Sequence, residues 1–185
     1  MKIGILNYDA CNLTSVYNSV YNLGYDPIII NNTEDFKKVK KLIIPGVGSA
    51  SHCISFLNEK NFFSEILNLK KLGMPILGIC LGMQIFGSKL YEHGENNGLG
   101  FFEAKVIPLK YEKKFNIGWK TVKAYQNRNY SFINLVNNKT FYFCHSYYLK
   151  PAISQKRNIA AKILLEDEIP AIVNKENIIG VQFHP

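Results

Sequence analysis

The sequence predicts an α/β fold in which an open, mostly parallel sheet is flanked by helices, with antiparallel hairpins in the C-terminal half. Three observations support this prediction. Short apolar runs alternate with helix-like patterns in the first half of the chain. Glycine-containing loops directly follow two of these runs. After about residue 98, apolar runs are separated by short polar turns, as in hairpins.

The first half contains four apolar runs that we expect to be buried strands. They span residues 2–7, 27–30, 41–44 and 74–79. Asn12 is expected to cap a helix that Gly24 ends, because apolar residues recur between them at helical spacing. Thr33 is expected to cap a short helix, and residues 62–72 also have a helical pattern. Short strands that are apolar throughout are typical of a sheet covered on both faces.

The second half contains five strand-like runs. They span residues 121–125, 140–149, 159–165, 171–174 and 178–183. We expect them to form hairpins that extend or flank the sheet. Because an open α/β sheet binds ligands beyond the carboxyl ends of its strands, two loops are of interest, residues 45–49 and 78–84.

Length and composition are those of one ordinary globular domain, expected to span residues 1–185. Apolar residues make up 47% of the chain and charged residues 19%. No apolar run approaches the roughly 20 residues of a membrane helix, and the N-terminus lacks a signal-peptide pattern, so a cytoplasmic location without membrane contact is expected. The net charge of +8 does not indicate nucleic-acid binding, because the lysines are scattered and only Arg128 and Arg157 are arginines.

The four cysteines, at positions 11, 53, 80 and 144, do not form a metal-binding pattern. None belongs to a Cys-x-x-Cys pair, and none has a histidine at zinc-finger spacing. Each cysteine alone is expected to be a small buried apolar residue. Only Cys80 has surroundings that indicate chemistry.

Cys80 lies in the run Gly-Ile-Cys-Leu-Gly at residues 78–82. The run follows an apolar strand and precedes a helix-forming segment, which is the context of a nucleophile elbow. Glycines permit the sharp turn, the N-terminus of the following helix favours a thiolate, and the Leu81 amide would point at an oxyanion. A buried cysteine in a tight strand-to-helix turn explains the same pattern equally well.

Two further elements would complete an acyl-transfer site. The loop Pro-Gly-Val-Gly at residues 45–48 could supply a second amide donor to an oxyanion, although glycine turns also occur for structural reasons. A cysteine nucleophile also needs a base. His184 follows one apolar run and His145 lies within another, and spacing alone does not choose between them.

Two longer motifs are Gly-Ile-Cys-Leu-Gly-Met-Gln at residues 78–84 and Gly-Val-Gln-Phe-His-Pro at residues 180–185. With them, nearly the whole chain resembles the class I glutamine amidotransferases. Three shorter motifs resemble the glutaminase subunits of imidazole glycerol phosphate synthase: Pro-Gly-Val-Gly at 45–48, Gly-Trp at 118–119 and His-Ser-Tyr-Tyr at 145–148. The resemblance implies a flavodoxin-like fold and no metal or organic cofactor.

The resemblance also implies a role for each matching residue. It makes Cys80 the nucleophile and His184 the base, with the backbone amides of Val47 and Leu81 as the oxyanion hole. The residues implied to contact glutamine are Gly48, Gln84, Glu92, His145, Ser146 and Tyr147. Glu92 would bind the α-ammonium group of glutamine, and its alternative is a solvated glutamate at a helix end. Asn12 and Trp119 would face the partner, a (β/α)8-barrel cyclase in a heterodimer.

Three departures from the family pattern bear on these expectations. The family continues after His-Pro with a glutamate that orients the histidine, so we expect residue 186 to be that glutamate and the chain to be truncated. Residues 8–12 read Tyr-Asp-Ala-Cys-Asn, where the family usually has Tyr-Gly-x-Gly-Asn. Residues 115–120 read Phe-Asn-Ile-Gly-Trp-Lys, where it usually has Pro-His-x-Gly-Trp-Asn. The last two segments face the partner in the family, so they affect the choice of partner more than the reaction.

The sequence therefore predicts hydrolysis of glutamine to glutamate and ammonia through a thioester on Cys80, with the ammonia channelled to a cyclase of histidine biosynthesis. Three alternatives stay open. The first is a paralogous glutaminase that supplies ammonia for amidination of a bacterial surface sugar. The others are a non-catalytic subunit on the same fold and a stand-alone hydrolase of γ-glutamyl bonds.

Overall fold

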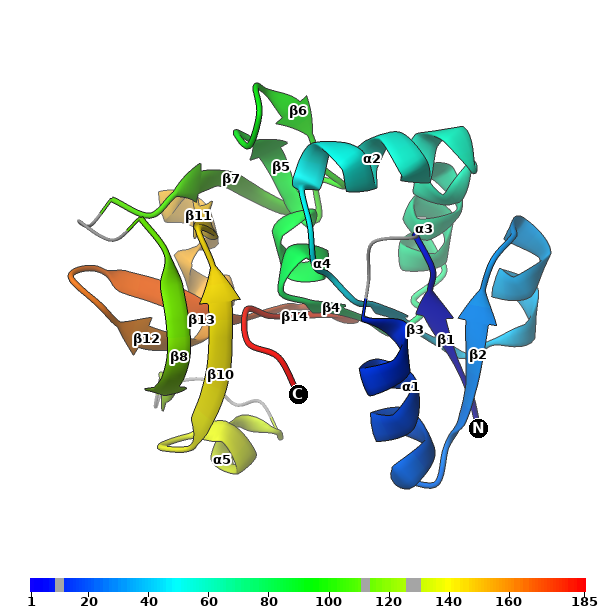
Figure 1. Ribbon diagram of the computed structural model, residues 1–185, viewed down its shortest axis with the longest axis horizontal. Helices are drawn as coiled ribbons and strands as arrows, with labels where there is room; N and C mark the ends of the chain where they lie inside the picture. Colours follow the sequence, from blue (N-terminus) through cyan, green and yellow to red (C-terminus); the bar gives the residue numbers. More distant parts are fainter. Residues whose placement is uncertain (9–11, 111–113, 126–130) are drawn as a thin grey trace.

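A computed structural model covers residues 1–185 and describes all of them except 9–11, 111–113 and 126–130 (Figure 1). The first half contains β1 (Lys2–Leu6), α1 (Leu13–Asn22), β2 (Asp26–Ile30), the 3-10 helix η1 (Thr33–Lys38), β3 (Lys41–Ile44), α2 (Ala50–Glu59), α3 (Phe62–Lys71), β4 (Ile76–Ile79) and α4 (Leu81–Gln84). The second half contains β5 (Gly87–Leu90), β6 (Asn96–Asn97), β7 (Phe102–Pro108), β8 (Asn116–Thr121), β9 (Lys123–Ala124), α5 (Ile133–Val136), β10 (Thr140–His145), β11 (Tyr147–Pro151), η2 (Ile153–Asn158), β12 (Ile159–Leu164), β13 (Glu168–Lys175) and β14 (Ile178–Val181).

The central sheet has the strand order β2-β1-β3-β4-β14-β13-β12-β9. In this order the strands from β2 to β14 run parallel, and β13, β12 and β9 continue the sheet in antiparallel orientation. The predicted α/β fold with antiparallel strands in the C-terminal half is confirmed. Because β4 and β14 are parallel neighbours, the segments that follow them leave the sheet at the same edge.

Helices cover both faces of the parallel part of the sheet (Figure 1). On one face, Val16 and Val20 of α1 pack in a cluster with Ile5. On the other face, Leu57 of α2 and Ile66 of α3 belong to the largest apolar core. This burial on both sides explains why the parallel strands are apolar throughout. Among the helices of the described residues, none has the length and hydrophobicity needed to span a lipid bilayer.

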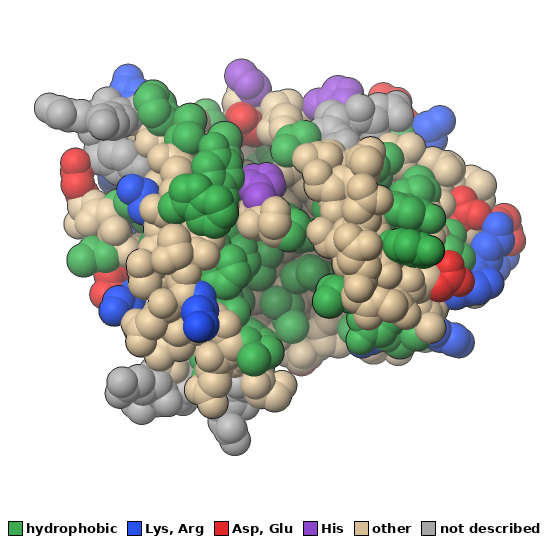
Figure 2. Space-filling view, turned by 60° about the horizontal axis from the view of Figure 1, so that its bottom comes forward, with side chains coloured by type: hydrophobic (Ala, Val, Ile, Leu, Met, Phe, Trp, Pro, Cys, Tyr) green, Lys and Arg blue, Asp and Glu red, His purple; other side chains and the backbone are tan. Residues whose placement is uncertain are grey.

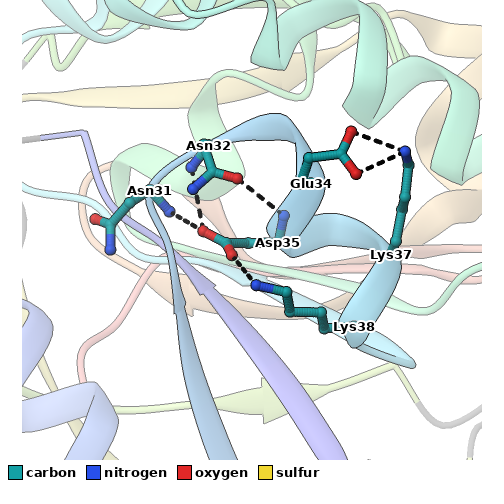
Figure 3. Close-up of polar contacts among 6 residues, drawn as sticks. All are labelled: Asn31, Asn32, Glu34, Asp35, Lys37 and Lys38. Atoms are coloured by element: carbon teal, nitrogen blue, oxygen red, sulfur yellow. Dashed lines mark hydrogen bonds and ion pairs between the residues drawn. The ribbon is translucent and has the colours of Figure 1, made fainter.

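Local side-chain hydrogen bonds fix the starts of two helices. Asn12 caps α1 as predicted, because its side chain accepts a hydrogen bond from a backbone amide three residues later. The predicted cap of the next helix is wrong by one residue, since Asn32 rather than Thr33 caps η1. The Asn32 side chain accepts from the Asp35 amide, and the Asp35 carboxylate accepts from the amides of Asn31 and Asn32 (Figure 3). This reciprocal pair is a capping box.

Several boundaries differ from the sequence expectations. The expected run 140–149 is two strands, β10 and β11, which divide at Ser146 and pair with β8 and β7 respectively. The run 121–125 is likewise divided at Val122 between β8 and β9. The helix after Cys80 has only four residues before the chain enters β5. Trp119 lies within β8, a strand that the apolar pattern did not predict.

The antiparallel half has its own core, and this core holds the end of the chain in place. It includes Phe143, Ile163, Ile172 and Phe183. Phe183 stacks on Phe141 with the ring centroids 4.1 Å apart and packs edge-on against Phe143. His184 follows Phe183 directly, so this aromatic cluster fixes where the histidine leaves the sheet.

Candidate active site

Cys80 lies on a strained turn between β4 and α4. Its φ of 53° and ψ of −106° are rare for a residue other than glycine. A Cβ on Gly82 would stand 1.9 Å from the Ile44 carbonyl oxygen, and one on Gly78 would stand 2.5 Å from the Gly82 carbonyl oxygen. The Cys80 amide donates to the Val181 carbonyl at 2.7 Å. The turn therefore has the geometry predicted for a nucleophile elbow and is joined to β14.

The Cys80 thiol is buried beside two polar groups. Cys80 is 6% exposed, the Gln182 amide donates to its Sγ at 3.6 Å, and Sγ lies 3.8 Å from the Cys144 carbonyl oxygen. Burial raises the pKa of the thiol to about 12, which outweighs the Leu81 amide and the Gln182 side chain that lower it. The Leu81 amide at the helix N-terminus favours the thiolate, as expected, but burial has the larger effect and favours the thiol.

His184 opens onto the same cavity as Cys80. Its backbone amide donates to the Tyr142 carbonyl at 2.9 Å, which holds the residue against β10. The side chain is half-buried, and this burial lowers the pKa of His184 below its usual value. The imidazole is therefore neutral at pH 7 and able to accept a proton.

His145 also lines the cavity, but both of its ring nitrogens are engaged. Nδ1 lies 2.9 Å from the Tyr147 carbonyl oxygen, and Nε2 lies 3.0 Å from the side-chain nitrogen of Asn116. Because a carbonyl accepts and an amide NH₂ donates, these bonds select the neutral tautomer with its proton on Nδ1. Burial lowers the pKa of His145 to about 4. A ring committed in this way is a poor proton acceptor, so the geometry favours His184 as the base.

The loop at residues 45–48 lies directly against the elbow. A Cβ on Gly46 would stand 2.4 Å from the Gly82 amide nitrogen and 2.7 Å from that of Leu81, so only glycine permits this approach. Gly48 has a φ of 93°, which is also favourable only for glycine. Val47, between the two glycines, is 40% exposed and lines the cavity. The loop therefore brings a second stretch of backbone beside the Leu81 amide.

The cavity over Cys80 has a volume of about 480 Å³ and gathers most of the predicted site residues. Those that line it are Asn12, Val47, Gly48, Cys80, Leu81, Gln84, Glu92, His145, Ser146, Tyr147 and His184. Trp119 is not among them, because it lies 69% exposed on β8 and packs edge-on against Tyr142, which does line the cavity. In Figure 2, hydrophobic side chains gather beside a hollow between the two halves of the molecule.

Gln84 and Glu92 are each held by hydrogen bonds at this cavity. Gln84 donates from Nε2 to the Tyr147 carbonyl at 2.8 Å and to the Gln182 side chain at 3.3 Å. Glu92 accepts from the Ala50 amide at 2.7 Å, at the N-terminus of α2. One Glu92 oxygen is thereby fixed, and the carboxylate places negative charge beside the glycine loop. Among the described residues, no group of three or more His, Cys, Asp or Glu side chains is arranged to hold a metal ion.

The sequence motifs predicted no role for four residues that lie at or near the site: Tyr8, Asn116, Tyr142 and Gln182. Gln182 is fully buried within the run Gly-Val-Gln-Phe-His-Pro, and a polar residue at a buried strand position was a usable signal. Asn116 and Tyr142 lie on β8 and β10, whose pairing the apolar pattern did not predict. Tyr8 is fully buried at the end of β1, and its hydroxyl group reaches the loop at residues 45–48.

The model of the glutamine amidotransferase class-I family matches residues 5–185. The chain belongs to this family. The imidazole glycerol phosphate synthase subunit HisH 2 of Methanococcus maripaludis is 41% identical over 99% of this chain and 91% of that protein. The imidazole glycerol phosphate synthase subunit HisH of Lactococcus lactis is 39% identical over 100% of this chain and 90% of that protein.

Solved structures of lower identity share the fold. The structure of PurLQS from Thermotoga maritima has a TM-score of 0.77 at 17% identity and covers 99% of this chain and 86% of that one. A crystal structure of a glutamine amidotransferase has a TM-score of 0.76, also at 17% identity, over 98% of this chain and 89% of that one. The resemblance to class I glutamine amidotransferases, made on the motifs at 78–84 and 180–185, is confirmed. This chain is a glutamine amidotransferase, an enzyme that releases ammonia from glutamine.

Proposed function

We propose that this amidotransferase is the glutaminase subunit of an imidazole glycerol phosphate synthase. One observation carries the proposal: a strained Cys80 and a neutral His184 open onto one cavity, beside Glu92 and the glycine loop. The relatives with 41% and 39% identity are named as subunits of that synthase. The reaction is expected in the cytoplasm, where thiols stay reduced.

The proposed reaction passes through a covalent intermediate on Cys80. His184 takes the thiol proton as the sulfur attacks the side-chain carbonyl carbon of glutamine. The resulting imidazolium gives that proton to the leaving nitrogen, so ammonia departs and a glutamyl thioester remains. His184 then takes a proton from water, which attacks the thioester and releases glutamate and the free thiol. Because burial raises the pKa of Cys80 to about 12, the attack of its sulfur on glutamine requires a base that takes the thiol proton at the same time.

The cavity walls suit the two ends of glutamine. The Glu92 carboxylate is an anionic partner for the α-ammonium group. Gly48 and Ser146 line the same cavity. His145 acts as a pocket residue, because its ring is held by Asn116 and Tyr147. The amides of Leu81 and Val47 would receive the oxyanion that forms on the attacked carbonyl.

We expect little hydrolysis by the chain without its partner. The amide of Val47 must face Cys80 to complete the oxyanion hole, and the glycines on either side of Val47 make rotation of the Gly46–Val47 peptide easy. A lost oxyanion donor costs about 100- to 1,000-fold in rate. A free chain that turns over as fast as the complex would contradict this switch.

The partner would dock on the exposed apolar surface beside the cavity. Phe115, Ile117 and Trp119 are all exposed, and the first two also line the cavity. Apolar side chains gathered at the rim of a site are typical of an interaction surface. A (β/α)8-barrel cyclase seated here, in a heterodimer, would receive ammonia directly from the Cys80 cavity.

A second candidate acceptor is a synthase that amidinates a bacterial surface sugar. It keeps the glutaminase chemistry and is favoured by the unusual residues at 115–120, which include the exposed Phe115 and Ile117. The other unusual segment, residues 8–12, falls largely on residues 9–11, outside the part of the chain that the structure describes.

A pair of cysteine variants tests the proposal. Cys80→Ala is expected to lower glutamate release by many orders of magnitude while the chain stays folded. Cys144→Ala is the matched control, because Cys144 meets Cys80 through its backbone carbonyl, which the substitution retains. Each variant is assayed with the histidine-pathway cyclase and its nucleotide ligand, then with a sugar-modifying synthase. More than about 10% residual activity in Cys80→Ala would rule out this nucleophile, and stimulation by the second synthase alone would change the acceptor.

A further inference from the structure

The Tyr8 hydroxyl group is bonded to the loop that would form half of the oxyanion hole. Tyr8 is fully buried at the end of β1. Its hydroxyl oxygen lies 3.0 Å from the Pro45 carbonyl oxygen and 3.4 Å from the Val47 carbonyl oxygen. A buried hydroxyl group needs a hydrogen-bond acceptor, and these two carbonyl oxygens belong to one short loop.

The two carbonyl groups flank the peptide that joins Gly46 to Val47. Rotation of that single peptide requires the peptides before and after it to stay in place. The single hydroxyl proton of Tyr8 is directed mainly to the Pro45 carbonyl at 3.0 Å and more weakly to the Val47 carbonyl at 3.4 Å, so this shared bond restrains the peptides on both sides of Gly46–Val47. A small cavity of about 60 Å³ also borders Gly46 and Val47.

Tyr8 also connects this loop to the surface expected to face the partner. It directly precedes residues 9–11, and Asn12 beyond them lines the Cys80 cavity. We propose that Tyr8 is a positioning residue. It restrains the peptides on either side of Gly46–Val47, so that this peptide alone rotates and turns the Val47 amide toward the oxyanion. The inference rests on the proposed function, because it assigns Tyr8 a part in the partner-dependent activity of the same site.

Tyr8→Phe keeps the ring and removes only the hydroxyl group. In the assembled complex with its stimulating synthase, we expect kcat to fall about tenfold, a fraction of the effect of losing an oxyanion donor, with KM for glutamine changed less than about twofold. Tyr148→Phe is the matched control, since Tyr148 is also buried but lies in the core of the antiparallel half. Replacing Tyr8 with 4-aminophenylalanine keeps a donor at the same place and should restore kcat.

Val47→Pro removes the amide through which Tyr8 is proposed to act, so adding Tyr8→Phe to it should cause no further loss of kcat. The proposal is overturned if Tyr8→Phe keeps the parent kcat, raises KM alone, or lowers kcat equally in both backgrounds. Failure of 4-aminophenylalanine to restore kcat would overturn it as well. Cys80→Ala is measured beside these variants: activity in that variant would refute the glutaminase site itself, whereas an inactive Cys80→Ala with a fully active Tyr8→Phe refutes only the role of Tyr8.

Discussion

Two histidines reach the Cys80 cavity, and their surroundings give them different capacities. The His184 backbone amide donates to the Tyr142 carbonyl, and among the described residues no hydrogen bond engages its imidazole ring. His145 is fixed through its ring, with Nδ1 toward a carbonyl and Nε2 toward an amide. Position along the chain could not separate them, because both lie at strand ends that reach one edge of the fold.

We expect His184→Ala to lower kcat of the complex by at least about 1,000-fold, because the base for both proton transfers is lost. His145→Ala should mainly raise KM for glutamine, because it removes a wall of the pocket. Glutamate release over a range of glutamine concentrations measures both effects. An inactive His145→Ala beside an active His184→Ala would show that the base is His145.

Burial of a neutral His145 should also make stability depend on pH. Its pKa is about 4 in the folded chain against an ordinary value of 6.5, so the unfolded chain binds more protons between these two pH values. The free energy of unfolding therefore falls as the pH drops from about 6.5 to about 4. Between pH 7 and pH 5 this loss amounts to about 2 kcal/mol, and His145→Gln should remove it.

Denaturant unfolding at the two pH values measures this difference. His52→Gln is the control, because His52 lies exposed on α2, away from the Cys80 cavity. A His145→Gln chain that loses as much stability as the parent between pH 7 and pH 5 would contradict the neutral, buried ring.

At the scale of elements, the elbow and the glycine loop are packed so closely that neither tolerates a side chain toward the other. Gly82 faces the end of β3, and Gly46 faces the first amides of α4. Both contacts are between backbone atoms, which cannot rotate away as the end of a side chain can. The backbone around the proposed oxyanion donors is thus held by contacts that leave no space for a methyl group.

We expect Gly82→Ala to abolish most activity and to destabilise the chain by about 1–3 kcal/mol, because its Cβ would collide with the Ile44 carbonyl. Gly87→Ala is the matched control. A Cβ on Gly87 would stand 3.2 Å from the Ala104 carbonyl oxygen and 3.3 Å from the Gln84 carbonyl oxygen, against 1.9 Å from the Ile44 carbonyl oxygen at Gly82. Thermal unfolding and glutamate release test both variants. Equal stability and activity in the two variants would show that the elbow has more room than its geometry implies.

The parallel strands and their helices could be predicted because each carries its own signal: an apolar run, a cap such as Asn12, or a loop with glycine. The division of residues 140–149 into β10 and β11 could not. Its cause is tertiary, since His145 and Tyr147 are directed to the cavity by pairing with strands far away in the sequence. Motifs in the sequence singled out Cys80, His184 and the 45–48 loop, whereas Asn116 and Tyr8 make contacts near the cavity that no local pattern encodes.

At the scale of the whole molecule, the apolar surface beside the cavity is expected to bind the partner without taking part in the glutaminase reaction. Trp119 is 69% exposed, and its ring packs edge-on against that of Tyr142 with the centroids 5.7 Å apart. We expect Trp119→Ala to weaken the complex with the synthase partner at least about tenfold, because exposed tryptophans often dominate such interfaces. At saturating partner concentration, kcat should stay close to that of the parent.

Leu164→Ala is the control for this prediction. Leu164 is 71% exposed, nearly the same as Trp119, but it lies on β12, in the central sheet. Calorimetric titration with the partner compares the dissociation constants of the two variants. Equal affinities for Trp119→Ala and the parent would place the docking surface elsewhere.

The insertion of β14 between β4 and β13 has a consequence for protein synthesis. Gln182, which donates to the Cys80 sulfur, lies 102 positions after it, and His184 follows two residues later. A ribosome adds about 5–20 residues per second, so a nascent chain carries the cysteine for several seconds before the proposed base exists. β14 follows β4 and β13 in the sequence but lies between them in the sheet, so this part of the sheet closes only once the strand that leads to Gln182 and His184 has been made. A nascent chain that lacks β14 is therefore expected to leave glutamine unhydrolysed.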